Sequence, residues 1–217
     1  MNRLMTTGRI YAMCPRTLTC LCATLVPLLF GCVSDQQKYD AIVAVNREFR
    51  AQYEAILAEK GTRGYMMRRD EAFSAMSKTL AELGMQPESV DQSLGFMSFY
   101  AKAPTPLTEE DWRATVAADL PKMRELARPH IGFPAEFIKF EPEGLQLVVN
   151  ASILDAPAGV LISITIRMRQ IEPPRSGMPR RDYPPPTGMR IGLDRVWTRF
   201  ELEIGRRQAL PRQPTAR

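Results

Sequence analysis

Hydrophobic and polar residues alternate along the stretch from residue 145 to residue 169, and this is the clearest structural pattern in the chain. A period of two places the apolar side chains on one face of a β-sheet and the polar ones on the other. The segment EFIKF opens this pattern, a turn follows at 141–144 with proline second and glycine last, and DAPAG separates the two alternating runs. The pattern predicts an antiparallel meander with one apolar face, made by Leu145, Leu147, Val149, Ala151, Ile153, Val160, Ile162, Ile164, Ile166 and Met168.

Residues 34–60 repeat their large side chains at spacings of three and four, which predicts an amphipathic helix that ends at Gly61. One repeating position is polar, Asn46, which in a coiled coil would set register or oligomeric state. Two interpretations stay open: the helix packs on its own domain, or it mediates self-association through residues 35–60. The repeating positions are Tyr39, Ile42, Asn46, Phe49, Tyr53 and Ile56.

Residues 63–91 predict a short strand, a helix at 70–84 capped by Asp70, and a second strand. Gly95 then introduces a third strand, FMSFYAKA. The helix ends at Gly84 and carries an apolar stripe that we expect to be buried. The stripe consists of Phe73, Met76, Leu80 and Leu83.

Thr108 is expected to open the next helix as its N-cap, followed by an acidic first turn. Pro121 should kink or restart this helix and Pro129 should end it, because proline lacks the N–H that a helix interior needs. Residues 172–188 form a proline-rich loop, which cannot lie in a central strand. A final amphipathic helix follows at 189–206.

Together these elements predict an α+β fold with an antiparallel sheet of about five to six strands. Two or three helices pack on the sheet, those at 70–84 and 189–206 among them, and an N-terminal helix precedes it. We expect a single α+β domain at 62–207, a helical segment at 32–61 before it, and a flexible tail at 208–217.

An apolar stretch at 18–31 precedes all of these elements, and it is shorter than the roughly 20 residues that cross a bilayer. Arg3, Arg9 and Arg16 come before its end and no acidic residue occurs before Asp35, which is the order of a secretory signal peptide. An ordinary cleavage site and a buried helix with an incidental cysteine are the alternatives.

The end of this stretch, Leu29-Phe30-Gly31-Cys32, resembles the lipobox of bacterial lipoprotein precursors. The resemblance implies that residues 1–31 are a signal peptide and that Cys32 becomes the first mature residue, carrying fatty acyl chains such as palmitate. The domain is then held on the periplasmic face of a membrane. Val33 and Ser34 lack the aspartate associated with inner-membrane retention in this family, which favours the outer membrane over the alternative, the inner membrane.

The order of strand, helix, strand and strand along residues 63–103 also resembles domains of several bacterial lipoproteins. Among these are the helix-grip modules of the barrel-assembly machinery. The resemblance implies a fold of this kind and carries over no function and no residue roles.

Basic and acidic residues are unevenly distributed along the expected mature chain. Without the three arginines of residues 1–31, 26 basic side chains remain against 24 acidic ones, a net charge of +2, so a global nucleic-acid footprint is absent. Residues 167–217 hold twelve arginines and five acidic residues, whereas residues 33–166 carry a net charge of −5. This polarity predicts attraction to anionic lipid head groups or to an acidic partner, or else arginines that are merely solvated.

Few residues carry catalytic or metal chemistry. His130 is the only histidine, and Cys32 is the only cysteine left once residues 1–31 are removed. These counts argue against a histidine metal cluster, thiol catalysis and an internal disulfide framework. The acidic run 109–111 is expected to start a helix rather than to hold a cation or cleave a glycan. We predict no catalytic residues, no cofactor and no metal.

The candidate contact residues lie in the proline-rich loop and are Arg175, Arg180, Arg181 and Tyr183. A stiff segment loses little entropy on docking, which suits recognition by a partner. Alternatively, the loop packs over the sheet with Tyr183 as its pin. The sequence therefore predicts a membrane-anchored, non-catalytic binding, scaffold or assembly accessory of the cell envelope.

We expect the protein to meet a protein partner through the sheet edge, the proline-rich loop or the N-terminal helix. The first alternative is a module that binds anionic lipid or glycan through the arginine-rich C-terminal part. The second is an enzyme of unknown class.

Overall fold

This computed structural model describes residues 33–172, 174 and 176–209. The predicted signal peptide, Cys32 with its expected lipid, and Arg175 lie outside these described residues. From Asp35 onward the described chain has the α+β architecture predicted from the sequence, an antiparallel sheet packed by helices and preceded by a helix. The predicted fold class is confirmed.

A five-stranded antiparallel sheet lies at the centre of the fold, with the strand order β1-β5-β4-β3-β2. Its two longest strands are the alternating runs of the sequence, and they pair along their whole length, from Leu145 opposite Gln170 to Ala156 opposite Gly159. The strands are β1 (Thr62–Tyr65), β2 (Gln86–Asp91), β3 (Phe96–Lys102), β4 (Leu145–Ala156) and β5 (Gly159–Gln170).

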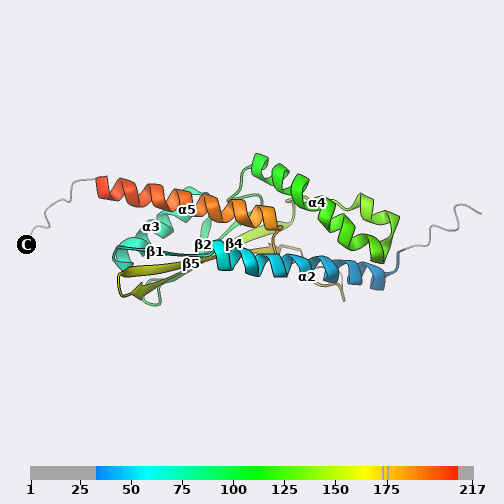
Figure 1. Cartoon of the computed structure of the whole chain (residues 1–217), viewed down its shortest axis with the longest axis horizontal. Coiled ribbons are helices and arrows are strands. Elements are labelled where there is room, and N and C mark those ends of the chain that lie inside the picture. The colour runs from blue at the N-terminus through cyan, green and yellow to red at the C-terminus, as the bar shows by residue number, and fades with distance from the viewer. Residues whose placement is uncertain (1–32, 173, 175, 210–217) are drawn as a thin grey trace, which may run out of the picture. The chain divides into compact units, whose positions relative to one another are not determined.

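Four helices accompany the sheet in the described part of the chain, as Figure 1 shows. They are α2 (Asp35–Lys60), α3 (Arg69–Glu82), α4 (Glu109–Ile131) and α5 (Pro186–Ala209), and a 3₁₀ helix, η2 (Phe133–Phe137), follows α4. The apolar face of the sheet packs against α3, α5 and the C-terminal half of α2, while α4 packs mainly on α2. Within the described residues, no helix has both the length and the apolar character needed to span a bilayer.

Trp197 and Phe200 of α5 form the centre of the main core, and both are completely buried. The indole N–H of Trp197 also donates a hydrogen bond to the carbonyl oxygen of Lys60, at 2.8 Å. A buried indole N–H needs such a partner. This bond therefore fixes the C-terminal end of α2 to the middle of α5.

The repeating apolar residues in the C-terminal half of helix α2 pack within their own domain. Phe49, Tyr53 and Ile56 are buried in the two main cores, with at most 5% of each side chain exposed. Of the two interpretations left open by the sequence, packing on its own domain is the arrangement that the structure has for this part of the helix.

Two predicted helix ends are wrong. Asp70 does not cap α3, because the N-cap position is Arg68, whose side chain makes no capping bond, and Asp70 lies in the first turn. Pro129 does not end α4 and Pro121 does not restart it, because the helix is continuous to Ile131; the alternative prediction, a kink at Pro121, stays a prediction. Both prolines are exposed, and the helix still buries Trp112 and Met123 on its other side, which offsets the missing backbone bonds.

Two further boundaries differ from the prediction. EFIKF, with which the β pattern opens, is not a strand but the end of η2 and the loop after it. Helix α5 begins at Pro186, inside the predicted loop, and continues to Ala209, inside the predicted tail. Proline suits the first position of a helix because its missing N–H has no helical partner there.

The edges of the sheet are partly covered by other segments. Strand β1 pairs only with residues 160–163 of β5. Beyond it, the N–H of Ile164 donates to the Gly61 carbonyl at 2.7 Å and the N–H of Met168 donates to the Asp182 carbonyl at 3.3 Å. At the other edge, the register of β2 shifts next to Pro87.

Candidate functional site

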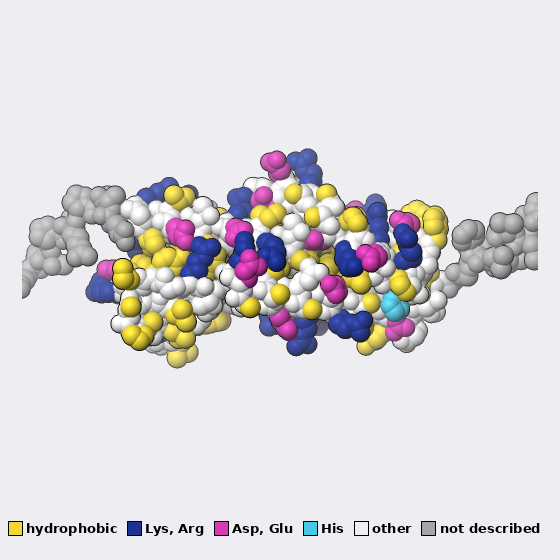
Figure 2. Space-filling model, in the orientation of Figure 1, with side chains coloured by type: hydrophobic (Ala, Val, Ile, Leu, Met, Phe, Trp, Pro, Cys, Tyr) yellow, Lys and Arg dark blue, Asp and Glu magenta, His cyan; other side chains and the backbone are white. Residues whose placement is uncertain are grey.

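Several arginines of the C-terminal part lie beside acidic residues. Five of its twelve arginines contact a carboxylate at 2.6–2.8 Å, and four of these carboxylates come from residues before 167, so part of the charge separation along the sequence is neutralised in space. On the face shown in Figure 2, basic and acidic side chains are intermixed. The pairs are Arg169–Glu88, Arg190–Glu59, Arg195–Asp111, Arg199–Glu82 and Arg207–Glu203.

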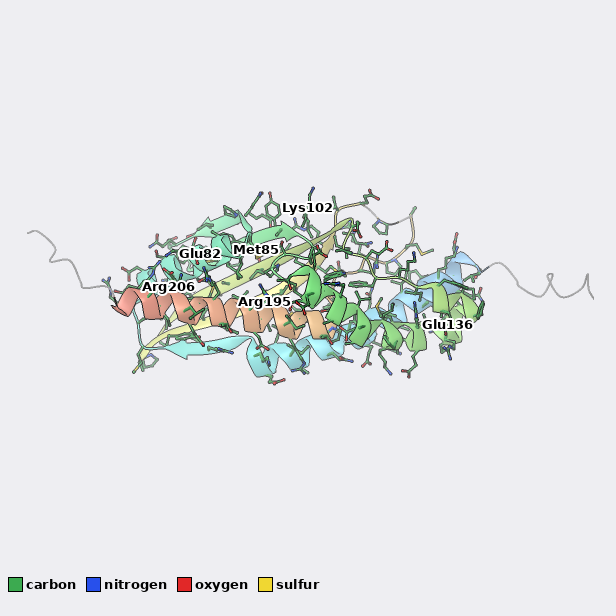
Figure 3. The ribbon with its side chains drawn as sticks, turned by 90° about the horizontal axis from the view of Figure 1, so that it is seen from above. Glu82, Met85, Lys102, Glu136, Arg195 and Arg206 are labelled. Carbon is green, nitrogen blue, oxygen red and sulfur yellow. The ribbon has the colours of Figure 1, made fainter. Side chains whose placement is uncertain are left out.

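The acidic run at the start of α4 has a structural role, as predicted. Thr108 and Asp111 form a capping box, in which each side chain accepts a hydrogen bond from the other's backbone N–H. Arg195, midway along α5 in Figure 3, donates to the same Asp111 carboxylate at 2.7 Å. Burial alone would raise the pKa of Asp111, but the bonds from Thr108 and Arg195 outweigh it and lower that pKa.

Glu203 is a buried carboxylate with two basic partners. Only 2% of it is exposed, and its oxygens accept hydrogen bonds from Lys78 at 2.9 Å and from Arg207 at 2.7 Å. Burial opposes ionisation, yet these two cations together hold the pKa of Glu203 below its ordinary value. The cluster joins α3 to α5 and leaves no free carboxylate for chemistry.

A pocket of about 420 Å³ opens between α2, α4 and the proline-rich loop. Ligand sites for small molecules typically measure roughly 300–1,000 Å³ and have mostly apolar walls with a few polar groups. This pocket has that character. Its walls include Ala41, Ile42 and Val45 from α2, Met123, Ala127 and Ile131 from α4, Ile138 after η2, and Met178, Pro179 and Arg181 from the loop; Lys38, Asn46, Gln170 and Pro174 complete the lining.

Hydrogen bonds hold the proline-rich loop over the pocket. The side-chain amide of Asn46 donates to the Arg180 carbonyl at 2.8 Å, and the Arg181 N–H donates to the side-chain oxygen of Gln170 at 3.3 Å. At the far end of the loop, the backbone N–H and the hydroxyl of Thr187 both donate to Asp119 of α4, at 2.9 and 2.7 Å. The loop is therefore part of the folded domain.

Arg181 differs from the paired arginines because its guanidinium forms no ion pair with any described residue. The side chain is half-buried in the wall of the pocket, and this burial lowers the pKa of the guanidinium below its ordinary value. Lys38, the other cation of the lining, contacts Asp35 at 3.0 Å. A cation that has lost part of its hydration without gaining a partner favours an anionic ligand.

The four predicted contact residues have different surroundings. Arg180 is exposed, whereas Arg181 lines the pocket. The ring of Tyr183 packs edge-on against that of Tyr53, with 5.4 Å between the ring centres, so this tyrosine holds the loop to α2. Arg175 lies outside the described residues, as does the predicted lipidation site, Cys32.

The apolar walls of the pocket were missed from the sequence. On α4, Met123, Ala127 and Ile131 repeat every four residues, which is the spacing of one helix face. The expected kink or restart at Pro121 hid this signal, because Pro121 lies just before the stripe begins. On α2, Ala41 and Val45 lie beside the repeating positions that the sequence did identify.

A second, shallower hollow lies at the start of α4. Trp112 stacks on Phe140 with 5.1 Å between ring centres, and the hollow of about 680 Å³ beside them is bordered by Glu109, Glu141 and Glu143. The indole N–H of Trp112 has no hydrogen-bond partner among the described residues but is itself shielded from solvent. In the described part of the chain, no three histidine, cysteine or acidic side chains come together as a metal site.

Comparisons with protein-family models, with curated proteins and with solved structures find no match to this chain.

Proposed function

We propose that this protein is a membrane-anchored, non-catalytic binding protein of a bacterial cell envelope, and that its ligand occupies the pocket under the proline-rich loop. The observation that carries the proposal is the pocket itself, which combines apolar walls from α2 and α4 with the unpaired cation of Arg181. Such a combination of apolar surface and few polar groups is typical of small-molecule binding sites.

The predicted membrane anchor supports the same proposal, because the first residue of the pocket lining lies close to it in the sequence. Lys38, which lines the pocket, follows the predicted lipidated Cys32 by only six residues. Acylation of Cys32 would hold the domain at the outer membrane, facing the periplasm, so that its pocket operates close to a lipid surface.

A fluorescent titration tests the pocket directly. The probe is N-phenyl-1-naphthylamine, a neutral apolar dye whose emission rises on transfer out of water, and the protein is the soluble chain from residue 33 to residue 217. This chain contains every described core residue. We expect saturable dye binding.

Matched substitutions on α2 locate the dye. Ile42 lines the pocket, whereas its neighbour Val43 is 40% exposed and outside the lining. Ile42→Trp should weaken dye binding at least about tenfold by filling the pocket, and Val43→Trp should leave it unchanged. Circular dichroism and the Tm of each variant verify folding. Absence of saturable binding, or equal behaviour of the two variants, would overturn the proposal.

A scaffold role is the second candidate, and the exposed Arg180 favours it, because its guanidinium has no ion-pair partner among the described residues. A protein partner with an acidic surface would then contact the outside of the loop. Site-specific crosslinking from Met178 in cells tests this role. A defined adduct that disappears in Arg180→Glu supports it, and an adduct that persists in that variant argues against this contact.

A further inference from the structure

The pocket lies along a stretch of two helices. On α4 the lining residues Met123, Ala127 and Ile131 span eight residues, and at 1.5 Å per residue they extend over about 12 Å. On α2 the lining runs over the same number of residues, from Lys38 to Asn46. Two apolar stripes of this length form the walls of an elongated slot. Its shape suits an extended hydrocarbon chain better than a compact ring.

Small side chains create the space in this slot. Ala41 of α2 and Ala127 of α4 are both buried and belong to the same minor core, where α2 and α4 approach each other. Met123 and Met178 add flexible, polarisable side chains to the walls. Methionine adapts to ligands of different length, because it is unbranched and has several rotatable bonds.

Three polar side chains of the lining besides Arg181 each make a contact within the protein. The Asn46 amide is bonded to the Arg180 carbonyl, the Gln170 side-chain oxygen accepts from the Arg181 backbone, and Lys38 is paired with Asp35. A bound peptide or glycan would bring many polar groups that these walls cannot satisfy. Arg181 is the cation of the lining that has no ion-pair partner among the described residues, and the planar fork of donors of its guanidinium matches a carboxylate or a phosphate.

We infer that the pocket binds an amphiphile with one acyl chain and one anionic head group, with the head group on the Arg181 guanidinium and the chain between α2 and α4. This inference rests on the proposed function and specifies its ligand. The ligand would come from the membrane that the predicted anchor at Cys32 keeps nearby. Fatty acids and single-chain phospholipids from a membrane have this chemistry.

Competition against the neutral dye tests the inference with dodecanoate, dodecyl phosphate, 1-dodecanol and dodecyltrimethylammonium, each below its micellar concentration. The four compounds share a chain and differ in head group. We expect the two anions to displace the dye at about one tenth of the concentration that dodecanol requires, the ratio expected for one charge-assisted contact. The cation should be weaker than dodecanol, and inorganic phosphate alone should displace nothing.

Variants of the two neighbouring arginines assign the head-group site. Arg181→Gln should abolish the preference for anions, measured as the ratio of the dodecanol and dodecanoate concentrations that displace half of the bound dye, and Arg181→Lys should retain part of that preference. Arg180→Gln is the matched control, because Arg180 lies beside it but is exposed. It should behave as the unaltered protein.

The outcomes separate this inference from the proposed function. Absence of dye binding contradicts the proposed function and the inference together. Dye binding that is displaced equally by acid and alcohol contradicts the inference alone, and so does an equal effect of the two glutamine variants or displacement by inorganic phosphate. If the acylated protein in lipid vesicles fails to bind the dye and Cys32→Ser restores binding, the protein's own acyl chain occupies the pocket. That result would also overturn the inference.

Discussion

The side-chain amide of Asn46 donates a hydrogen bond to the backbone carbonyl of Arg180, at 2.8 Å, and so connects helix α2 to the proline-rich loop. In the sequence, Asn46 is the polar member of an apolar repeat, a position that can fix register between two helices. In the fold it fixes the position of a loop instead. The loop residue next to Arg180 is Arg181, so this bond also positions the cation of the pocket.

Replacing Asn46 with alanine should loosen the proline-rich loop, because the Arg180 carbonyl loses its side-chain donor. We expect a stability loss of about 1 kcal/mol, the usual value of one net hydrogen bond, and faster hydrogen exchange in residues 176–183. Gln36→Ala is the control, since that amide donates to Asp40 on the same helix. Unchanged exchange in the loop of Asn46→Ala would show that other contacts hold it.

Glu203→Gln should destabilise the protein at neutral pH by about 1–3 kcal/mol, because Lys78 and Arg207 lose their charged acceptor. The pKa of Glu203 is lowered in the folded state. Its stabilising effect is therefore complete above the unfolded pKa, about 4.3, and disappears as the pH falls through the lower folded pKa.

Urea unfolding at pH 7 and in the acid range measures this effect. The unaltered protein should lose more stability on acidification than Glu203→Gln does, so that the two curves converge at low pH. Glu125→Gln, in an exposed pair with Lys122, is the control and should change little. Parallel curves for the protein and Glu203→Gln would refute the assignment.

Gly95→Ala and Gly132→Ala should have different costs although both glycines have similar positive φ angles, +68° and +65°. A methyl group at Gly132 meets nothing within 4 Å, so we expect only the penalty of its positive-φ backbone conformation (φ 65°, ψ −141°), about 1–3 kcal/mol. At Gly95 the methyl group would collide with the carbonyl oxygen of Ile153 and with Arg69.

The collision should raise the cost of Gly95→Ala to about 3 kcal/mol or more, since overpacking adds to the backbone penalty. Chemical unfolding of the two variants under identical conditions gives the difference. Equal losses would mean that β3 and β4 separate easily at this point and that the turn before β3 is not tightly packed.

Cys32→Ser should release the domain from the membrane, because the predicted acyl chains require the thiol. We expect loss of palmitate labelling and a shift of the mature protein from the membrane to the soluble envelope fraction. Cys22→Ser, inside the predicted signal peptide, should leave both unchanged. Membrane sedimentation of Cys32→Ser at the level of the unaltered protein contradicts the anchor and the location proposed with it.

Sequence patterns predicted the fold well where a period was uninterrupted. The alternation along β4 and β5 and the stripe of Phe73, Met76 and Leu80 correspond to buried faces in the structure. Local rules failed where tertiary packing outweighed them. Pro121 remains within a continuous helix because α4 buries residues on both sides of it.

The candidate site could be predicted only in part. Arg181 was identified as a contact residue, but its difference from Arg180 depends on burial, which a local sequence pattern does not contain. The uneven charge distribution of the sequence was also misleading, since four of the twelve C-terminal arginines pair with acids that are distant in the chain, as Arg169 does with Glu88. Pairing across the fold, rather than composition, determines which cation stays available.

The bond from the Met168 N–H to the Asp182 carbonyl affects how copies of the domain would contact each other if the proposed anchor held them on one bilayer. Beyond the short β1, the outer edge of β5 would offer free backbone groups to the strand of a neighbouring copy. The proline-rich loop occupies that edge, and Pro87 with its register shift interrupts the opposite one. If the proposed anchor holds copies of the domain close together, the loop would hinder them from joining edge to edge into aggregates.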